Sequence, residues 1–287
     1  MLKIYYSLTK PGIIYGNLIT VAAGFILGTT GPFHDALFLE TLAGISLIIA
    51  SGCVLNNIID RDIDGLMERT KGRALVKGLV PLTHAYTLAA GLGSFGAYLL
   101  GYFTNIVTLL TGLAGLFAYV FIYSLWSKRT SVYGTLLGSI SGAVPPVVGY
   151  TAATGHIDLG AIILFIILVM WQMPHSYAIA IYRLSDYQHA HIPVLPLARG
   201  MRTTKIHMFE YIIGFTAFVL ALYFFGYAGK LYLFTMLPLG LLWTTLSFSG
   251  FTSTDDARFG KMMFISSIIV ITLFSLVLSL DHFFFIP

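Results

Sequence analysis

The chain has 287 residues, of which 57% are hydrophobic and only 10% are charged, and its formal net charge is +4. Soluble domains carry about 25% charged residues, so this composition excludes an ordinary soluble domain and predicts an integral membrane protein. The single cysteine, Cys53, excludes an intramolecular disulfide and a cysteine-based metal site. The first residues, MLKIYYSLTKPG, show neither a cleavable signal nor a transit peptide. We therefore expect one multi-pass membrane domain over residues 1–287, in a bacterial cytoplasmic (inner) membrane.

Nine apolar runs are long enough to form helices that cross a bilayer, each of which needs about 20 residues. The runs lack the alternating pattern of a transmembrane barrel, so the predicted fold is an all-α polytopic bundle. The expected spans are about 12–30, 37–57, 82–102, 105–124, 132–153, 159–182, 208–227, 231–249 and 262–280.

The basic residues support this number of spans and give it an orientation. With the N-terminus in the cytoplasm, fifteen of the 16 Lys and Arg residues fall in cytoplasmic segments, and Lys230 alone falls outside. Adding or removing one span in mid-chain would destroy this asymmetry. The sequence thus predicts a cytoplasmic N-terminus, an outer C-terminus, and a cytoplasmic working face, because the connections 58–81, 125–131 and 183–207 are long enough to carry function.

The most unusual stretch runs from Cys53 to Lys77 and holds four acids and five bases directly after an apolar segment. Its acids and amides repeat at helical spacing, so in a helix these side chains would share one face. Carboxylate and carboxamide oxygens one turn apart suit Mg²⁺, which completes its shell with water and substrate phosphates. The alternative is a solvated helix end, but ionisable groups at the membrane boundary are more often functional. The residues on this predicted metal face are Asn56, Asn57, Asp60 and Asp64.

Two groups of basic residues accompany the metal face and are candidates to bind a diphosphate. The first group, Arg69, Lys71, Arg73 and Lys77, follows the acids directly. The second group, Lys128 and Arg129, ends the segment YSLWSKR together with Tyr123. This second group also matches a positive flank with an interfacial aromatic belt, which remains its alternative interpretation.

A third polar group lies at the end of the sixth predicted span, in WQMPHSYAIAIYRLSDYQHAHIPVLP. Gln172 and His175 lie inside the apolar run beside Pro174, which should kink the helix and free a backbone carbonyl. His175 either contacts a substrate or bonds a neighbouring helix, and the sequence favours neither interpretation. Arg183 and Asp186 follow where this span meets the cytoplasm.

Two of these motifs resemble those of a known family. NNIIDRDID resembles the first aspartate-rich motif of the UbiA superfamily of intramembrane prenyltransferases, and YSLWSKR resembles its Tyr and Lys/Arg motif. Longer blocks, TKPGIIYGNLIT, SGCVLNNIIDRDIDGLMERTKGRALVKGL, KRTSVYGTLLGSISGAVPPVVGY and the WQMPH segment, are similar to the haem-modifying branch. The chain departs from the superfamily pattern in two places: Asn57 stands where that pattern has aspartate, and the second aspartate-rich motif keeps Asp186 but has Ala190 at its later position.

The resemblance implies a UbiA-like bundle with a cavity that opens to the cytoplasm. It also implies transfer of farnesyl from farnesyl diphosphate to a vinyl group of haem b, with addition of water, to give haem O and diphosphate. Mg²⁺ is then the cofactor and haem b a substrate. The partners are the lipid bilayer and a haem A synthase or terminal oxidase assembly pathway, with no nucleic acid. Asp60, Asp64 and Tyr123 are the expected catalytic residues, and the expected substrate-binding residues are Asn17, Arg69, Lys71, Arg73, Lys77, Lys128, Arg129, His175, Arg183 and Asp186.

Two alternatives remain open at this point. A prenyltransferase acting on a quinone precursor would share the acid face but not require the WQMPH segment. A membrane transporter would also place Asp and His in helices, although transporter sites usually lie near the midplane between repeated halves.

Overall fold

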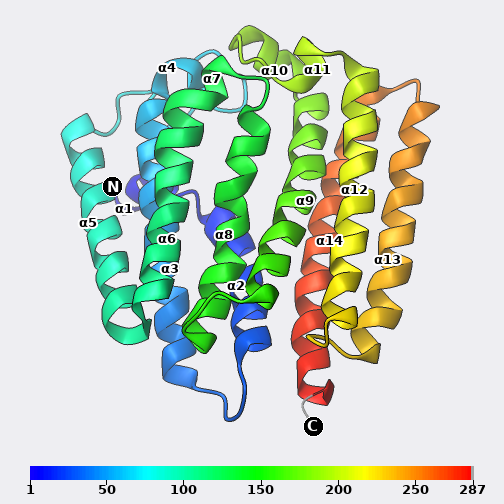
Figure 1. The fold of residues 1–287 in the computed structure, drawn as a ribbon. Coiled ribbons are helices and arrows are strands. Elements are labelled where there is room, and N and C mark those ends of the chain that lie inside the picture. Colours follow the sequence, from blue (N-terminus) through cyan, green and yellow to red (C-terminus); the bar gives the residue numbers. More distant parts are fainter. Residues whose placement is uncertain (286–287) are drawn as a thin grey trace.

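The computed structural model describes residues 1–285, and every regular element in that range is helical. Figure 1 shows the arrangement. The long helices are α2 (Pro11–Gly28), α3 (Asp35–Ile59), α5 (Leu82–Leu99), α6 (Ile106–Phe117), α8 (Gly134–Thr154), α9 (Leu159–Tyr182), α12 (Met201–Phe224), α13 (Lys230–Phe248) and α14 (Asp256–Phe285). Short helices are α1 (Leu2–Leu8), α4 (Arg61–Asp64), α7 (Lys128–Thr130), α10 (Leu184–His189), α11 (Leu195–Ala198) and the 3₁₀ turn η3 (Ser249–Phe251). Two π-helical segments, η1 (Leu100–Thr104) and η2 (Ala118–Ser127), continue α5 and α6.

The nine predicted spans correspond to nine helical passes within residues 1–285, and the prediction of an all-α membrane bundle is confirmed. Eight of the passes are long and apolar enough to cross a membrane. The pass formed by α5 and η1 is not among the eight. Its first turns contain polar residues, including Thr83, His84 and Thr87, and these lower its mean hydropathy.

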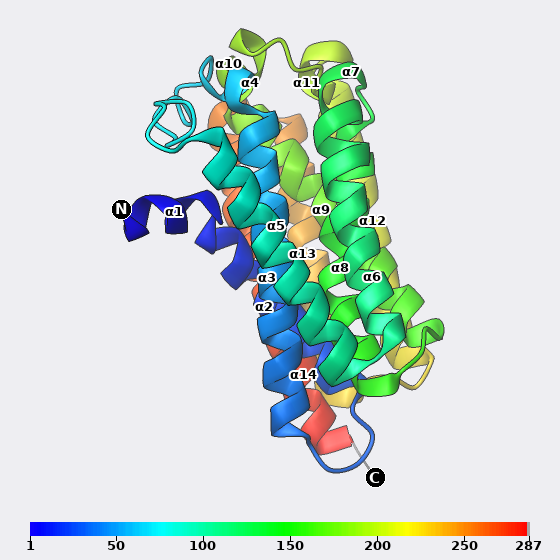
Figure 2. The same cartoon turned by 90° about the vertical axis from the view of Figure 1, so that its left-hand side faces the viewer.

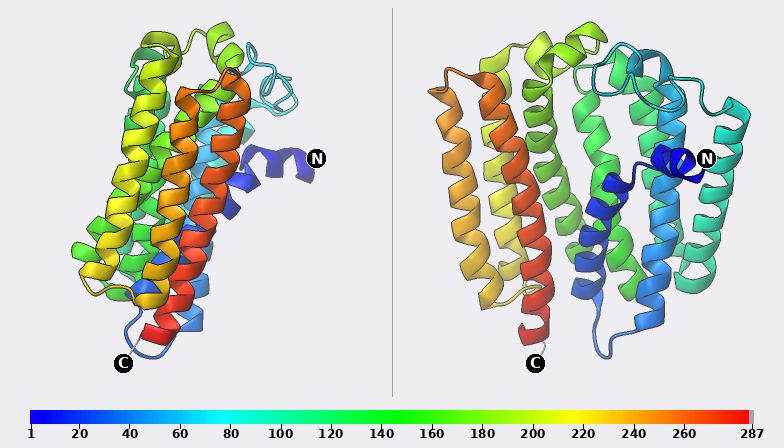
Figure 3. Two further views of the ribbon diagram at one scale, coloured as in Figure 1. Left: turned by 90° about the vertical axis from the view of Figure 1, so that its right-hand side faces the viewer. Right: turned by 180° about the vertical axis from the view of Figure 1, so that it is seen from behind.

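The short helices α4, α7, α10 and α11 gather at one end of the bundle, which we call the loop face (Figure 1). The opposite end carries shorter connections, and α13 begins there at Lys230. The long helix α14 runs from the loop face to that opposite end (Figure 3). The prediction of an outer C-terminus concerns residues 286–287, which lie outside the described residues.

Two helices begin earlier than the hydropathy predicts, because hydropathy marks the part of a helix that lies in lipid and not its polar first turns. Helix α12 begins at Met201 and α14 at Asp256, so both project beyond the apolar zone at the loop face. Buried Lys205 ties these extensions together. Its Nζ donates 2.7 Å to the carbonyl of Gly250 and lies 2.5 Å from a carboxylate oxygen of Asp256.

The first helix, α1, is an element that the sequence analysis did not predict. It runs roughly perpendicular to the long helices and projects from the side of the bundle (Figure 2). The chain then turns sharply at Lys10, whose φ of 51° is left-handed, and Pro11 begins α2. Leu8 packs into a cluster with Val54 and Leu75, which fixes this turn against α3.

Helices α2 and α8 touch backbone to backbone beside the centre of the bundle. A Cβ added at Gly24 would lie 2.0 Å from the carbonyl oxygen of Pro146, and one added at Gly149 would lie 2.0 Å from that of Val21. Small residues permit such close approach between membrane helices. This contact fixes the wall from which Asn17 faces the cavity described below.

Candidate active site

A cavity of about 980 Å³ lies between α2, α3, η2, α8, α9 and α14. Its deeper part is apolar and is lined by residues such as Ile45, Ile48, Leu116 and Leu168. Its end at the loop face is polar. The predicted site residues that line the cavity are Asn17, Asn56, Asp60, Asp64, Arg69, Arg73, Tyr123, Lys128, His175 and Arg183.

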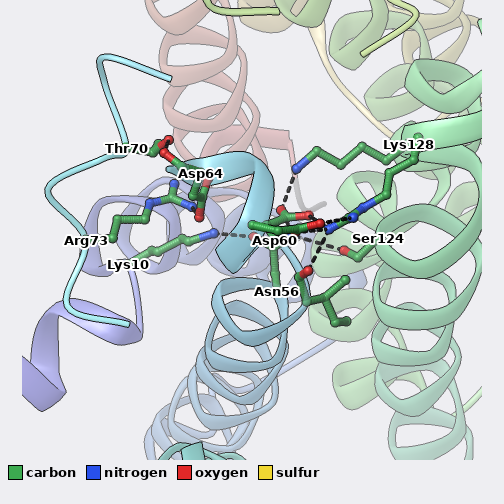
Figure 4. A network of polar contacts seen from close by, with 11 residues as sticks. Lys10, Asn56, Asp60, Asp64, Thr70, Arg73, Ser124 and Lys128 are labelled. Carbon is green, nitrogen blue, oxygen red and sulfur yellow. Dashed lines mark hydrogen bonds and ion pairs between the residues drawn. The ribbon is translucent and has the colours of Figure 1, made fainter. Parts of the chain in front are cut away.

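The carboxylate of Asp60 lies at the centre of the polar end (Figure 4). Lys128 donates a hydrogen bond to its Oδ2, and the Asn56 amide donates to the same oxygen at 2.8 Å and to the Ser124 hydroxyl at 3.0 Å. The other oxygen, Oδ1, is buried and has no hydrogen-bond partner among residues 1–285. Its ion-pair partner, the Arg129 guanidinium, lies 3.9 Å away. Asp60 therefore keeps one carboxylate oxygen without a hydrogen bond among the described residues.

The second carboxylate, Asp64, is held by the loop that follows it. Arg73 donates to its Oδ2, and the Thr70 hydroxyl donates 2.9 Å to its backbone carbonyl. The loop thus folds back over α4 and brings Arg73 to the cavity (Figure 4). The cationic loop therefore pairs with Asp64 through Arg73, whereas Asp60 pairs with Lys128 from outside this loop.

Lys10 is a site residue that the sequence analysis missed, because it was counted there only as a cytoplasmic base. It lines the cavity, and its ammonium group donates to Oδ1 of Asn56 (Figure 4). Desolvation, with a smaller contribution from nearby Arg73, lowers the pKa of Lys10 to about 8. One feature of the sequence could have indicated that Lys10 lies close to the bundle: it stands between the apolar residue Leu8 and Pro11, which begins a helix. Lys10, Arg73 and Lys128 therefore surround Asp60 and Asp64 with three cations.

The π-helical segment η2 places the aromatic wall of the site. The backbone N–H of Lys128 donates to the carbonyl of Tyr123, five residues earlier, so the Lys128 ammonium lies over the Tyr123 ring at 6.0 Å. Tyr119 stacks on Tyr123 with ring centroids 6.0 Å apart and also lines the cavity. π-helical turns occur frequently at functional sites. Sequence spacing read at 3.6 residues per turn could not predict this register, and it missed Tyr119.

Asn57 requires a correction, because it does not share the face of Asn56, Asp60 and Asp64. Its amide donates 2.8 Å to the backbone carbonyl of Leu8, and it does not line the cavity. Adjacent residues of a helix point about 100° apart, and here Asn56 faces the cavity while Asn57 faces Leu8. Asn57 instead ties α3 to the α1–α2 junction.

Four further predicted residues lie outside the cavity lining. Lys71 pairs with Glu68 at 2.6 Å in an exposed position, and Lys77 is also exposed. Arg129 makes two 2.7 Å hydrogen bonds to Asp62 and one of 2.6 Å to the carbonyl of Ile59. Their predicted contacts with substrate gain no support from this geometry.

Asp186, the fourth, anchors the loop that carries Arg69. It is buried and accepts a 3.0 Å hydrogen bond from the backbone N–H of Glu68. Ala190, at the later position of the incomplete second motif, is buried in an apolar cluster with Ile63 and Met67. An acidic side chain at this position would be buried among these apolar groups.

The position of His175 is compatible with both interpretations left open by the sequence, namely contact with a substrate and a hydrogen bond to a neighbouring helix. It lines the cavity, and its Nδ1 also lies 2.8 Å from the Ser267 hydroxyl of α14. Arg183 lies at the end of α9, with its guanidinium 4.4 Å from the Tyr182 ring centroid, and also lines the cavity. The cavity therefore joins a charged end to a wall that offers an imidazole and a guanidinium.

Comparison with known proteins identifies the class of this protein. The sequence matches the UbiA prenyltransferase family over residues 17–268. The chain therefore belongs to this family and is an integral membrane prenyltransferase.

Its relatives narrow the class further. The chain is 52% identical over 283 residues to a protein of Chromohalobacter salexigens named protoheme IX farnesyltransferase, covering 98% of this chain and 95% of the relative. It is 50% identical over 281 residues, with the same coverage, to a protein of that name from Yersinia pseudotuberculosis.

Solved structures of low sequence identity share the fold. A structure described for digeranylgeranylglyceryl phosphate synthase matches with a TM-score of 0.82 at 17% identity, over 98% of both chains. A UbiA homologue from Archaeoglobus fulgidus, bound to GPP and Mg²⁺, matches with a TM-score of 0.70 at 14% identity, over 93% of this chain and 99% of that chain.

Proposed function

We propose that this protein transfers the farnesyl group of farnesyl diphosphate to a vinyl group of haem b, with addition of water, to give haem O and diphosphate. The observation that carries the proposal is about 50% identity along nearly the whole chain to proteins named protoheme IX farnesyltransferase. The cavity supports it, because one space of about 980 Å³ has a charged end for a diphosphate and a long apolar part for prenyl and porphyrin groups.

The donor set fits Mg²⁺. Asp60 and Asp64 both line the cavity, and Oδ1 of Asp60 is buried without a hydrogen-bond partner among the described residues. No group of three or more His, Cys, Asp or Glu side chains suited to a metal occurs in that part of the chain. Mg²⁺ commonly takes one or two carboxylates and keeps positions for water and phosphate oxygens, so two acids suffice. When bound to Asp60, Asp64 and the amide oxygen of Asn56, it would offset the charge of the diphosphate as the bond to the farnesyl carbon weakens.

The cations of the site act on the leaving group. Lys10, Arg73 and Lys128 are each paired with a polar side chain of the acid face, and diphosphate oxygens would compete for these pairs. The C–O bond to the farnesyl carbon breaks, and diphosphate departs with the electron pair. Positive groups held at the departing oxygens stabilise that charge more strongly in the transition state than in the substrate.

The aromatic wall acts on the allylic cation that remains. Tyr119 and Tyr123 lie next to the acid face, and ring faces attract a cation. The vinyl group of the acceptor attacks this cation, water adds to the new carbocation beside the pyrrole ring, and one proton is released. Exclusion of other water by the apolar lining protects the farnesyl cation from hydrolysis.

The loop face is proposed to be cytoplasmic, in a bacterial inner membrane. Fifteen of the 16 basic residues belong to segments at or leading to that face, whereas Lys230 begins α13 at the opposite end. Single cysteines introduced in the 65–81 loop and in the connection 225–229 test this orientation, with a thiol reagent that cannot cross the membrane. In intact cells the reagent should label the cysteine in 225–229 and not the one in 65–81, and the reverse pattern would contradict the orientation.

Purified protein supplied with haem b, farnesyl diphosphate and Mg²⁺ tests the reaction. The expected product has the mass of haem b plus one farnesyl group and one hydroxyl group, with one proton and one diphosphate released per product. A quinone precursor offered in place of haem b should give no prenylated product. Prenylation of the quinone precursor with unmodified haem b would overturn the proposal while leaving the membership in the prenyltransferase family intact.

A further inference from the structure

The imidazole ring of His175 is held in one orientation. It stacks on Trp171, with ring centroids 4.8 Å apart and an interplanar angle of 22°, and Phe264 packs against it at 5.1 Å. The Trp171 indole N–H donates 2.7 Å to the backbone carbonyl of Ser267, which joins α9 to α14 at the same level. The ring plane is therefore fixed by two aromatic neighbours.

One ring nitrogen faces α14 and the other is left for the cavity. Nδ1 of His175 lies 2.8 Å from Oγ of Ser267, a fully buried residue that does not line the cavity. His175 does line the cavity, together with its neighbours Trp171 and Phe264. Nε2 makes no hydrogen bond to any residue in the range 1–285.

The hydrogen bonds of Ser267 determine where the imidazole proton lies. A serine hydroxyl has a single proton. Ser267 donates it 2.6 Å to the carbonyl of Phe264, so toward His175 its oxygen can only accept. Nδ1 of His175 must then carry the ring proton, and Nε2 keeps its lone pair.

The opposite arrangement satisfies fewer groups. If Ser267 donated to Nδ1, its 2.6 Å bond to Phe264 would be lost, and the proton would move to Nε2. The described residues provide no hydrogen-bond acceptor for an N–H at Nε2. The Nδ1–H form keeps the bond from Ser267 to Phe264 and leaves Nε2 free for a ligand in the cavity, so the network favours this form.

We propose that Ser267 is a positioning residue that holds His175 as the Nδ1–H tautomer, so that Nε2 ligates the iron of bound haem b. This inference rests on the proposed function, since it requires haem as the acceptor. Neutral imidazole is a common metal ligand, and a hydrogen bond at its second nitrogen fixes the tautomer, orients the ring and raises its basicity. Iron ligation would also fix the porphyrin relative to α9, while Arg183 at the end of the same helix offers its guanidinium to a propionate.

The serine next in sequence provides a matched control. Ser266 accepts a 3.1 Å hydrogen bond from the Trp243 indole N–H and does not line the main cavity. Ser267→Ala removes the acceptor of the His175 proton, Ser266→Ala removes a comparable hydroxyl elsewhere on α14, and Ser267→Thr keeps the hydroxyl at the original position.

Haem titration of the purified variants measures ligation. We expect Ser267→Ala to weaken haem binding about ten- to hundredfold and to shift the Soret band toward that of His175→Ala, as loss of an outer hydrogen bond does at metal sites. Ser266→Ala should match the wild type, Ser267→Thr should recover most of the affinity, and the KM for farnesyl diphosphate should stay within about twofold. A Soret band that is the same in wild type, Ser267→Ala and His175→Ala would overturn the proposal.

The tautomer itself is measured without haem, by the ¹⁵N shifts of histidine-labelled protein, with His175→Asn assigning the signal. Protonated Nδ1 and unprotonated Nε2 support the proposal, and the reverse pattern overturns it even where Ser267→Ala is too unstable to purify. The product-mass experiment is separate: if haem is never prenylated, the proposed function fails whatever the tautomer proves to be.

Discussion

The side-chain amide of Asn57 donates a 2.8 Å hydrogen bond to the backbone carbonyl of Leu8, and this contact joins the end of α3 to the turn between α1 and α2. Two residues beyond Leu8, the left-handed Lys10 turns the chain, and its ammonium group enters the site. Asn57 therefore acts on the site from outside the cavity, through the position of Lys10.

Replacing Asn57 with Ala should loosen α1. The variant loses the hydrogen bond and leaves the Leu8 carbonyl without its partner, a loss of about 1–3 kcal/mol. Hydrogen exchange at residues 2–8 should become faster, and the KM for farnesyl diphosphate should rise several-fold. Ser7→Ala is the control, because Ser7 is exposed and bonds only the local carbonyl of Ile4. Unchanged protection of α1 in Asn57→Ala would contradict the role given to this contact.

Lys10→Gln should raise the KM for farnesyl diphosphate by about tenfold or more, since a charge-assisted hydrogen bond to phosphate is lost. Lys3→Gln removes the same charge from an exposed position of α1 and should leave KM near the wild-type value. Haem affinity should change little in either variant. If both substitutions raised KM equally, Lys10 would contribute only to the overall positive charge of the loop face and not to a specific contact with diphosphate.

The pH dependence of kcat/KM provides an independent test of Lys10. Its pKa of about 8 governs the free enzyme, so kcat/KM for farnesyl diphosphate should fall as the pH rises above about 8 and the ammonium loses its proton. Lys10→Arg should shift this fall to higher pH, because guanidinium stays charged. The free energy of unfolding should change with pH in the opposite direction to kcat/KM. The folded protein disfavours the charged form of Lys10, so its stability should rise with pH between about 8 and the ordinary lysine pKa. A wild-type profile in Lys10→Gln would exclude Lys10 as the titrating group.

Hydropathy was sufficient to predict the bundle, but it could not predict elements that depend on packing. Helix α1 has seven residues, too few for a periodic signal, and forms where Leu8 packs against Val54 and Leu75. The π-helical register of η2 likewise depends on its neighbours, such as the Ser124 contact with Asn56. No local pattern in the sequence indicates either feature.

In the site, the sequence predicted residues that lie close together along one helix. The i, i+4 spacing of Asp60 and Asp64 predicts that their side chains lie on one side of a helix. The structure keeps this helical spacing, because the backbone N–H of Asp64 donates to the carbonyl of Asp60 at 2.8 Å across the boundary between α3 and α4. Lys10 and Asn56 are 46 residues apart and Glu68 and Asp186 are 118 apart, so their contacts exist only in the folded chain.

Asp60→Asn and Asp64→Asn should each reduce turnover by at least about a hundredfold, because neutral amides replace the anionic oxygens that a divalent cation requires. Membrane insertion should stay close to wild type. Asp62→Asn is the matched control from the same segment. Asp62 is 66% exposed, and the hydrogen bonds from Arg129 lower its pKa to about 2 without placing it in the cavity. Turnover is measured as diphosphate release over a range of Mg²⁺ concentrations, and wild-type rates at saturating Mg²⁺ in either site variant would remove that carboxylate from the metal site.

Lys128 and Arg129 are adjacent in sequence but contact different partners. We therefore expect Lys128 to bind substrate and Arg129 to stabilise the end of α3. Lys128 lines the cavity and pairs with Asp60, whereas Arg129 pairs with exposed Asp62 and with the carbonyl of Ile59. Lys128→Gln should therefore raise the KM for farnesyl diphosphate about tenfold or more and leave haem affinity unchanged, because the lost cation faces the leaving group. Arg129→Gln should change KM much less and instead lower thermal stability, since the end of α3 loses its guanidinium contacts. Substrate titrations and thermal unfolding of both variants decide the matter: equal increases in KM for the two substitutions, or equal loss of affinity for both substrates, would indicate that these residues serve only as the positive flank of a membrane helix.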